Sequence, residues 1–480
     1  MAANHPAHHR RPPSGGRLAD WVTFSPNQFY PIYNWFYYKE GFSRDLVFFL
    51  VEKYGLKGPL LDPFGGSGTT ALAAREMGLE GISFDVSPVP LLAARAKTHA
   101  YDLTALQAQF EQLKGRSFST DTRHIDVRIR KLFFAESLVE VMGIYRVVNG
   151  LEDKKLRDFF TLAIVDTAAR VAHVDKVGGS LRKRKKPRLP VTKLFLGKCT
   201  KMLIDLKKTR LEGPEPRILQ ADARQMPLEN ESVGAIVTSP PYLNKIEYTK
   251  VYKLELGLFF DYSETQLRSF ISDNVKGDAA FSQYPPVAQA YFSDMKKVLA
   301  EMHRVLVPGG IAAINVAGGC FPDRVVQADE EFILLGKEIG FELKDNLFCR
   351  PIHCMADRTT KVGMARETIV VMQKKSARSS TRSTAVPPTS IFWPIATAVS
   401  LTAPKTCSPS CSWFAAAKSA KFTGTTSNTT SKFLPPRPKT SSTDRVPSEP
   451  ISMKPAANST SVPPAHSTKA SNASPTSWPS

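Results

Sequence analysis

A short apolar run that ends in an acid and passes into a glycine-rich turn is the feature that most limits what this chain can fold into. The run is Gly58–Asp62, the turn is Pro63-Phe64-Gly65-Gly66-Ser67-Gly68, and a helical pattern continues to Met77. In a strand, turn and helix of this kind, glycines let the backbone approach a ligand closely. The turn lacks the Lys-Ser/Thr of a P-loop and the dinucleotide glycine spacing, so triphosphate binding is not predicted.

Strand-like runs and helical patterns alternate along most of the chain. Strands separated by helices indicate an α/β fold with a mainly parallel sheet and helices on both faces. The seven expected strands are Gly58–Asp62, Gly81–Asp85, Arg217–Gln220, Val233–Thr238, Gly310–Val316, Phe341–Phe348 and Glu367–Gln373.

Changes in composition divide the chain into five parts. We expect a flexible basic N-terminus (1–19), a first part of the α/β domain (20–100), a mostly helical insertion (101–211), a second part of the domain (212–375) and a tail (376–480). The tail holds 54 Ser, Thr or Pro among its 105 residues, so it cannot bury enough apolar surface to fold and is predicted to be disordered. Its abrupt start also suggests a second hypothesis, an out-of-frame translation.

The charge balance favours a polyanionic partner. The chain carries 64 Lys or Arg against 44 Asp or Glu, a formal charge of +20, and nucleic acid is the first expectation, ahead of an anionic membrane. A membrane span and a secretory signal are not predicted, because no apolar run is long enough. The six cysteines lack paired spacing and are expected to be thiols, and the scattered histidines predict no metal site.

The glycine-rich turn resembles a known motif once Asp85 is considered. Asp85 ends the next expected strand, where an acid can accept hydrogen bonds from ribose hydroxyls. The run Asp62–Thr70 resembles the S-adenosylmethionine loop of the DNA amino-methyltransferases (N4-cytosine/N6-adenine DNA methylases), Asp85 resembles their second acidic motif, and Asp222 the third. The resemblance implies a Rossmann-like S-adenosylmethionine-dependent methyltransferase fold with a seven-stranded sheet. It implies a cofactor site formed by Asp62, Pro63, Phe64, Gly66, Ser67, Gly68, Thr69, Asp85 and Asp222.

A second motif, Ser239-Pro240-Pro241-Tyr242, follows the strand Val233–Thr238 directly. The prolines stiffen the loop and remove two amide donors. It resembles the catalytic loop of the same family, in which the first side chain and the first proline's carbonyl accept the target amino hydrogens. The aromatic ring stacks on a base flipped out of double-stranded DNA. Because stacking needs only the ring, we expect Tyr242→Phe to be mild.

The serine at position 239 resembles the cytosine-N4 subgroup, whereas adenine-N6 enzymes mostly have Asp there. The first hypothesis is therefore site-specific methylation of cytosine N4 in DNA. Adenine-N6 methylation, RNA guanine-N2 methylation and a catalytically inactive DNA-binding protein remain as alternatives. Cytosine-C5 chemistry is excluded, because it needs a nucleophilic Pro-Cys pair and none of the cysteines follows a proline.

Further features concern contacts and partners. The insertion carries a basic run, which we expect to contact DNA phosphates or else to form a solvated loop. The basic residues are Arg182, Lys183, Arg184, Lys185, Lys186 and Arg188. An aromatic segment within Thr23–Tyr54 resembles the family motif that packs beside the methionine end of the cofactor. The resemblance also implies a prokaryotic cytoplasmic, nucleoid-associated enzyme, with a cognate restriction endonuclease as a possible partner.

Overall fold

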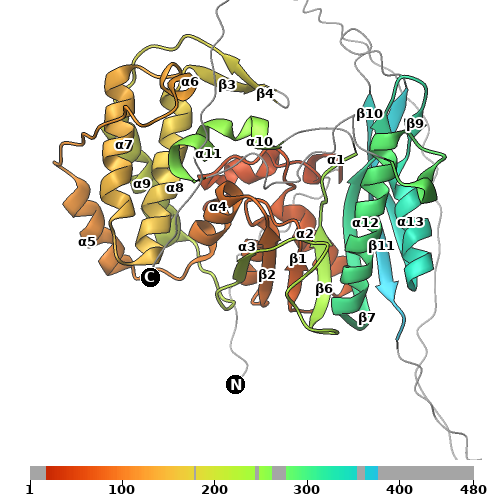
Figure 1. Ribbon diagram of the computed structural model, residues 1–480. Coiled ribbons are helices and arrows are strands. Elements are labelled where there is room, and N and C mark those ends of the chain that lie inside the picture. The colour runs from red at the N-terminus through yellow and green to blue at the C-terminus, as the bar shows by residue number, and fades with distance from the viewer. Residues whose placement is uncertain (1–17, 178–179, 244–247, 262–276, 354–362, 377–480) are drawn as a thin grey trace, which may run out of the picture. The chain divides into compact units, whose positions relative to one another are not determined.

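The computed structural model describes residues 18–177, 180–243, 248–261, 277–353 and 363–376, and seven of their strands form one sheet (Figure 1). The order across it is β10-β11-β7-β6-β1-β2-β5, and only β11 runs against its neighbours. The strands are β1 (Leu60–Asp62), β2 (Gly81–Asp85), β5 (Arg217–Gln220), β6 (Val233–Thr238), β7 (Leu306–Ala317), β10 (Phe341–His353) and β11 (Met364–Lys374). The predicted mainly parallel α/β sheet is confirmed.

Alternation along each strand sends apolar side chains to both faces of this sheet. Leu60 packs in one buried cluster with α2 (Arg44–Tyr54) and α3 (Thr69–Glu76). Leu61 packs in another cluster with α12 (Pro286–Val305) and α13 (Ala328–Ile339). The sheet is therefore the middle of three layers, and the carboxyl ends of its parallel strands lie at one edge. Ligands of open α/β sheets bind at that edge.

The insertion supplies most of a third buried cluster. It packs against α4 (Pro88–Thr98) and the aromatic segment near the N-terminus. Its elements are α5 (Leu103–Leu113), α6 (Val127–Arg130), α7 (Ala135–Asn149), α8 (Lys154–Val171), the antiparallel hairpin β3 (Val174–Val177) and β4 (Ser180–Lys183), and α9 (Val191–Lys208). Two helices that follow the Ser-Pro-Pro-Tyr loop, α10 (Tyr248–Val251) and α11 (Lys253–Phe259), pack against this cluster.

Shorter elements complete the described chain. They are α1 (Leu18–Trp21), the 3₁₀ helices η1 (Ser25–Phe29), η2 (Tyr33–Trp35) and η3 (Ala279–Phe281), and the small pair β8 (Gly319–Cys320) and β9 (Val325–Val326).

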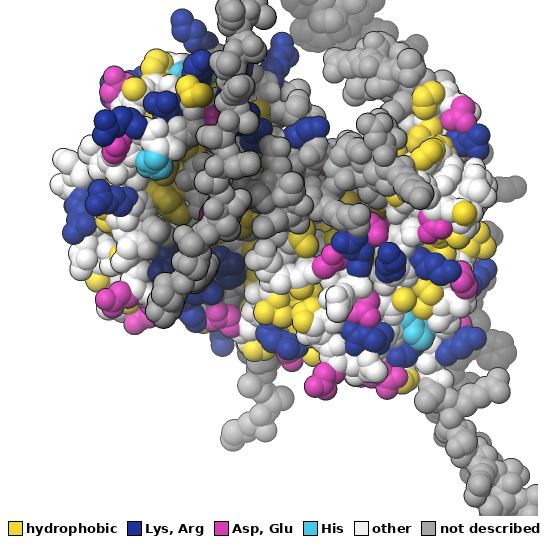
Figure 2. All heavy atoms as spheres, in the orientation of Figure 1, with side chains coloured by type: hydrophobic (Ala, Val, Ile, Leu, Met, Phe, Trp, Pro, Cys, Tyr) yellow, Lys and Arg dark blue, Asp and Glu magenta, His cyan; other side chains and the backbone are white. Residues whose placement is uncertain are grey.

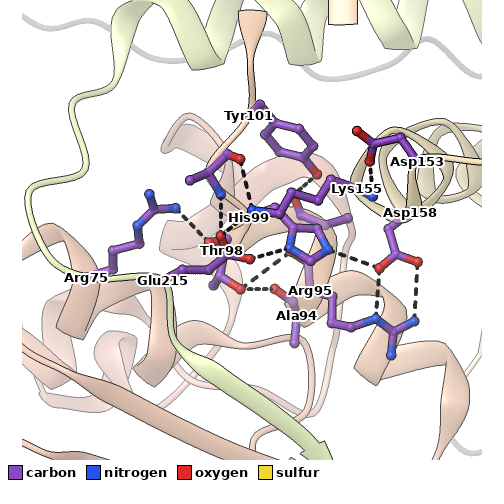
Figure 3. Close-up of polar contacts among 12 residues, drawn as sticks. Arg75, Ala94, Arg95, Thr98, His99, Tyr101, Asp153, Lys155, Asp158 and Glu215 are labelled. Atoms are coloured by element: carbon purple, nitrogen blue, oxygen red, sulfur yellow. Dashed lines mark hydrogen bonds and ion pairs between the residues drawn. The ribbon is translucent and has the colours of Figure 1, made fainter. Parts of the chain in front are cut away.

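A network of charged side chains fastens the insertion to α4 (Figure 3). His99, just after α4, contacts Asp158 of α8 through Nε2 at 3.1 Å and Glu215 through Nδ1 at 2.7 Å. Arg95 of α4 forms an ion pair with the same Asp158, and Lys155 of α8 pairs with the same Glu215. The network lies at the carboxyl end of α4, away from the edge where β2 ends, so it holds the insertion in place and does not form part of the candidate site.

Four further expectations concerned the ends of the chain, the cysteines, membrane spans and metal sites. Residues 1–17 and the predicted tail from 377 onward lie outside the described residues. Cys199 and Cys349 are buried thiols, but Cys320 is disulfide-bonded, so the prediction of thiols throughout is wrong for Cys320. In the described helices, no segment is long and apolar enough to cross a membrane. The same residues contain no cluster of three or more metal-ligating side chains.

Candidate active site

The turn after β1 has a backbone shape that requires glycine. Gly66 and Gly68 have φ of +51° and +82°, in the left-handed region that side chains with a Cβ rarely adopt. A Cβ on Gly66 would lie 2.8 Å from the Tyr38 ring, and one on Gly68 would lie 2.8 Å from Ala94 of α4. The glycines therefore allow the turn to sit between the aromatic segment and α4.

Asp62 ties this turn to the strand that carries the Ser-Pro-Pro-Tyr loop. Its Oδ1 accepts hydrogen bonds from Thr238 Oγ1 at 2.6 Å and from the Phe64 amide at 3.1 Å, and its Oδ2 accepts from Thr70 Oγ1 at 2.8 Å. The carboxyl is 1% exposed, and this burial raises its pKa to about 6 in spite of the three donors. Asp62 thus positions the two loops relative to each other, and direct contact with a cofactor stays a prediction.

Asp85 lies at the carboxyl end of β2 and faces the same turn. Its Oδ2 accepts from the Gly66 amide at 3.1 Å and its Oδ1 from the Ser87 amide at 2.8 Å. Burial raises its pKa to about 6, and the two backbone donors oppose that shift. Each oxygen keeps a lone pair, so the carboxylate is suited to accept hydrogen bonds from a pair of ribose hydroxyls.

The other predicted cofactor residues are arranged around this turn. Ser67 and Thr69 are buried, Phe64 is half-buried against the cluster of α12 and α13, and Pro63 begins the turn. Asp222 follows β5, which is hydrogen-bonded to β2, and its carboxylate is held by Arg224 at 2.6 Å. The structure therefore brings the predicted cofactor residues to one edge of the sheet, and their individual contacts stay predictions.

The Ser239-Pro240-Pro241-Tyr242 loop begins where β6 ends, beside β1. Tyr242 donates a hydrogen bond from its hydroxyl to Glu367 of β11 and accepts one from Asn315 Nδ2 of β7 at 2.7 Å. Glu367 has no exposed surface, and its other oxygen accepts from Arg350 Nε of β10. The ring of Tyr242 is thus fixed from the neighbouring strands.

A cavity of about 360 Å³ opens beside this loop, a volume suited to a small ligand. The residues that line it come from four parts of the chain: the N-terminal segment, the loop after β6, strand β10 and strand β11. These residues are Val22, Thr23, Lys39, Glu40, Gly41, Ser239, Pro240, Tyr242, Arg350, Pro351, Ile352 and Glu367. Ser239 and Tyr242 were predicted from the sequence, whereas Glu40, Arg350 and Glu367 were not.

Glu40 brings an acidic group to the cavity wall. Its Oε2 accepts a hydrogen bond from Tyr252 of α10–α11 at 3.1 Å, and its buried Oε1 has no hydrogen-bond partner among the described residues. Burial raises the pKa of this carboxyl. Tyr252 also stacks on Tyr38, with ring centroids 5.6 Å apart. The aromatic segment, the cofactor turn and the helices after the catalytic loop are therefore in direct contact.

The aromatic segment is also joined to the turn by Asn27. Its Nδ2 donates to the Phe42 carbonyl at 2.9 Å and lies 3.5 Å from Thr69 Oγ1. Trp35, fully buried, donates from Nε1 to Asp205 of the insertion helix α9 at 3.0 Å. The segment thus lies between the cofactor turn and the insertion.

The basic run lies on and after the hairpin of the insertion, whose strand β4 contacts α10. Arg184 and Lys186 form ion pairs with Asp175 at 3.0 and 3.2 Å. Arg182, Lys183 and Lys185 are exposed and form no ion pair with any described residue. Arg188 lies 3.8 Å from Glu140. Figure 2 shows Lys and Arg side chains on both the insertion and the sheet part of one face, with acidic side chains among them. DNA contact by this run stays a prediction.

The sheet order, the glycine turn after β1 and the acid that ends β2 are typical of the Rossmann-like fold of S-adenosylmethionine-dependent methyltransferases. Comparison with known proteins gives the family. The N6/N4 DNA methylase family model matches residues 233–438, and the similarity to Type II methyltransferases supports a DNA amino-methyltransferase family, whose cofactor is S-adenosylmethionine. The residues fit that cofactor. The remaining lone pairs of the Asp85 carboxylate can accept hydrogen bonds from ribose hydroxyls, and the glycine turn lets the backbone approach the ligand closely.

Three relatives are similar over different lengths. The Type II methyltransferase M.BsoBI of Geobacillus stearothermophilus is 25% identical over 345 residues, 59% of this chain and 64% of the relative. M.AvaI of Nostoc sp. is 26% identical over 270 residues, 49% of this chain and 56% of the relative. M.MjaII of Methanocaldococcus jannaschii is 39% identical over 71 residues, 15% and 13% of the two chains. The chain thus spans less than two thirds of the length of the first two relatives.

Proposed function

We propose that the protein is a site-specific DNA methyltransferase that transfers a methyl group from S-adenosylmethionine to the N4 amine of cytosine in double-stranded DNA. The observation that carries the proposal is the placement of Ser239. It follows β6 directly and lines a cavity large enough for a base, and Asp62 connects its strand to the cofactor turn.

The chemistry asked of the protein is positioning. The lone pair of an exocyclic amine is delocalised into the ring, so the amine is a weak nucleophile. Acceptors at Ser239 Oγ and the Pro240 carbonyl would draw the amino hydrogens out of the ring plane and restore the lone pair. S-adenosylmethionine held at the glycine turn and Asp85 would supply the electrophilic methyl group, and the proton displaced from the amine would pass to solvent water.

Tyr242 would hold the flipped base, because its ring also lines the cavity and its hydroxyl is anchored on the sheet. The relatives named Type II methyltransferases support a place in restriction and modification, with a cognate endonuclease as partner. The exposed Arg182, Lys183 and Lys185 support phosphate contacts by the insertion.

The proposal is tested by expressing the gene in a host that lacks DNA methylation and digesting the host DNA to nucleosides. We expect mass spectrometry to detect N4-methylcytosine with the intact gene and none with a Ser239→Ala gene. N6-methyladenine as the sole product would overturn the base assignment. Unmodified DNA from a host with verified soluble protein would overturn the activity.

A further inference from the structure

We propose that Arg350 is the residue that selects cytosine, by donating hydrogen bonds to the N3 and O2 atoms of the flipped base. This inference rests on the proposed function and names the substrate determinant of the same site. Nothing in the Ser-Pro-Pro-Tyr motif itself points to it, because Arg350 lies on β10, 108 positions beyond Tyr242 in the sequence.

Arg350 reaches the cavity from the far side of the catalytic loop. It is paired across the β10–β11 ladder with Glu367, and both side chains line the cavity together with Ser239 and Tyr242. Its side chain is 38% exposed, whereas that of Glu367 is 0% exposed. The cation is therefore at the cavity surface and its counter-charge is beneath it.

The ion pair fixes the orientation of the guanidinium. Arg350 donates to Glu367 through Nε, and its two terminal nitrogens make no hydrogen bond to any described residue. A guanidinium is planar and rigid, so an anchored Nε determines where the terminal N–H groups point. Because placing a carboxylate without exposed surface is costly even when it is paired, an arrangement of this kind indicates a role beyond stability.

The donors and acceptors of the cavity match the hydrogen-bonding edge of cytosine. That edge presents an amine, then the N3 acceptor, then the O2 acceptor, so acceptors at Ser239 and Pro240 meet the amine while an arginine fork meets N3 and O2. Adenine presents its amine and N1, but the next position is a C–H group that accepts no hydrogen bond. If adenine entered this site, one of the two arginine donors would have no acceptor, and adenine would therefore be a poorer substrate than cytosine.

The first test compares purified full-length variants on unmethylated genomic DNA with S-adenosylmethionine. We expect Arg350→Met to lower the initial rate of N4-methylcytosine formation by roughly ten- to a hundredfold, the loss associated with one bidentate base contact. Cofactor affinity should not change. Arg366→Met is the matched control, since Arg366 is the next residue along β11 from Glu367 and pairs with Asp329 and Glu330 instead. It should keep the rate of the intact protein.

The second test separates base reading from the support that the Arg350–Glu367 pair gives to Tyr242. Once the methylated sites are mapped by sequencing, a duplex is made with 3-deazacytosine at the target, which replaces the N3 acceptor by C–H. The intact protein should lose rate on this duplex, and Arg350→Met should lose little more. Equal losses in both proteins would overturn the inference. Arg350→Lys, which keeps a cation beside Glu367, replaces Arg350→Met if the latter folds poorly.

The outcomes distinguish this inference from the proposed function. If the intact protein forms N4-methylcytosine and Arg350→Met forms it at the same rate, the role of Arg350 is wrong and the proposed function stands. If the intact protein forms only N6-methyladenine, both are wrong.

Discussion

The hydroxyl of Tyr242 donates a hydrogen bond to Glu367, a carboxylate with no exposed surface. The same hydroxyl accepts from Asn315, which is 2% exposed. The ring that we assign to base stacking is thus held by its far end, and the sheet behind the loop sets its position. This changes the expectation from the sequence that only the ring matters.

Tyr242→Phe is therefore expected to be damaging. Removing the hydroxyl takes one hydrogen bond from buried Glu367 and one from buried Asn315, a loss of about 1–3 kcal/mol, and the methylation rate should fall about tenfold. The measurement is the initial rate per folded protein. Tyr101→Phe is the control, because it removes a hydroxyl hydrogen bond to the Ala96 carbonyl in the network that joins the insertion to α4. A fully active Tyr242→Phe would show that the anchor does not matter.

Ser239→Ala should abolish most methyl transfer and leave cofactor affinity unchanged. Losing one aligned acceptor in a closed site costs a rate factor of roughly 10²–10³. Ser232→Ala is the matched control, because Ser232 precedes the same strand and its hydroxyl donates to the nearby Glu229 carbonyl. Single-turnover rates and calorimetry of cofactor binding measure the two effects separately. A fully active Ser239→Ala would contradict the catalytic role.

Cofactor binding should weaken as the pH falls through about 6. The pKa of Asp85 is raised to about 6 by burial, so the free protein is protonated there below that pH, while ribose hydroxyls bind best to the ionised carboxylate. Binding then requires release of a proton, and affinity falls by up to about tenfold per pH unit. Calorimetry at pH 5, 6 and 7.5 measures it. Asp85→Asn should bind weakly with a flatter pH dependence, and an unchanged dependence would remove Asp85 from the site.

Lys97 should make the folded protein less stable at neutral pH than at alkaline pH. It is 1% exposed, and burial lowers its pKa to about 7. In the unfolded chain the amine has its ordinary pKa near 10.4, so between about pH 7 and 10 the unfolded state binds more protons and the free energy of unfolding rises with pH.

Lys97→Met should thus stabilise the protein by a few kcal/mol at pH 7 and by less at pH 9.5. Urea denaturation at both pH values measures the difference. Lys193→Met, at an exposed position of α9, should change neither value. If Lys97→Met raised the free energy of unfolding equally at both pH values, Lys97 would not titrate in this range.

The basic run should contribute unequally to DNA binding. Replacing Arg182, Lys183 and Lys185 by Ala should reduce the slope of log K against log salt by about 0.9 for each phosphate that the variant no longer neutralises. Replacing Arg184 and Lys186 should reduce it less, because both already pair with Asp175. Titrations at several salt concentrations give the slopes. An unchanged slope in the triple variant would support a solvated loop without a DNA contact.

Local patterns predicted the sheet well and the cavity poorly. The runs at Gly81–Asp85 and Val233–Thr238 coincide with β2 and β6, because burial on both faces requires short continuous apolar strands. Arg217–Gln220 coincides with β5, which lies at the edge of the sheet and is largely exposed. The cavity depends on pairing between distant strands: Tyr242 and Glu367 are 125 residues apart. The one local signal was Glu367 itself, a charged residue next to the apolar stretch of the last strand.

The hairpin of the insertion was also missed. The basic run directed attention to charge, although the Gly-Gly pair at 178–179, between two short segments that become β3 and β4, is a turn signal. The sequence could not show which basic residues form ion pairs. Arg184 and Lys186 pair with Asp175 across the hairpin, whereas Arg182, Lys183 and Lys185 form no ion pair with a described residue.

The wall of the cavity combines residues near the N-terminus, from Val22 to Gly41, with Arg350, Pro351, Ile352 and Glu367, and this has a consequence during translation. A nascent chain acquires the cofactor turn within its first 70 residues, but the last pieces of the wall are synthesised some 300 residues later. A polypeptide that is released before Glu367 is synthesised would contain the cofactor turn but would lack part of the wall of the proposed base cavity. Premature products of the gene should therefore leave the host genome unmodified.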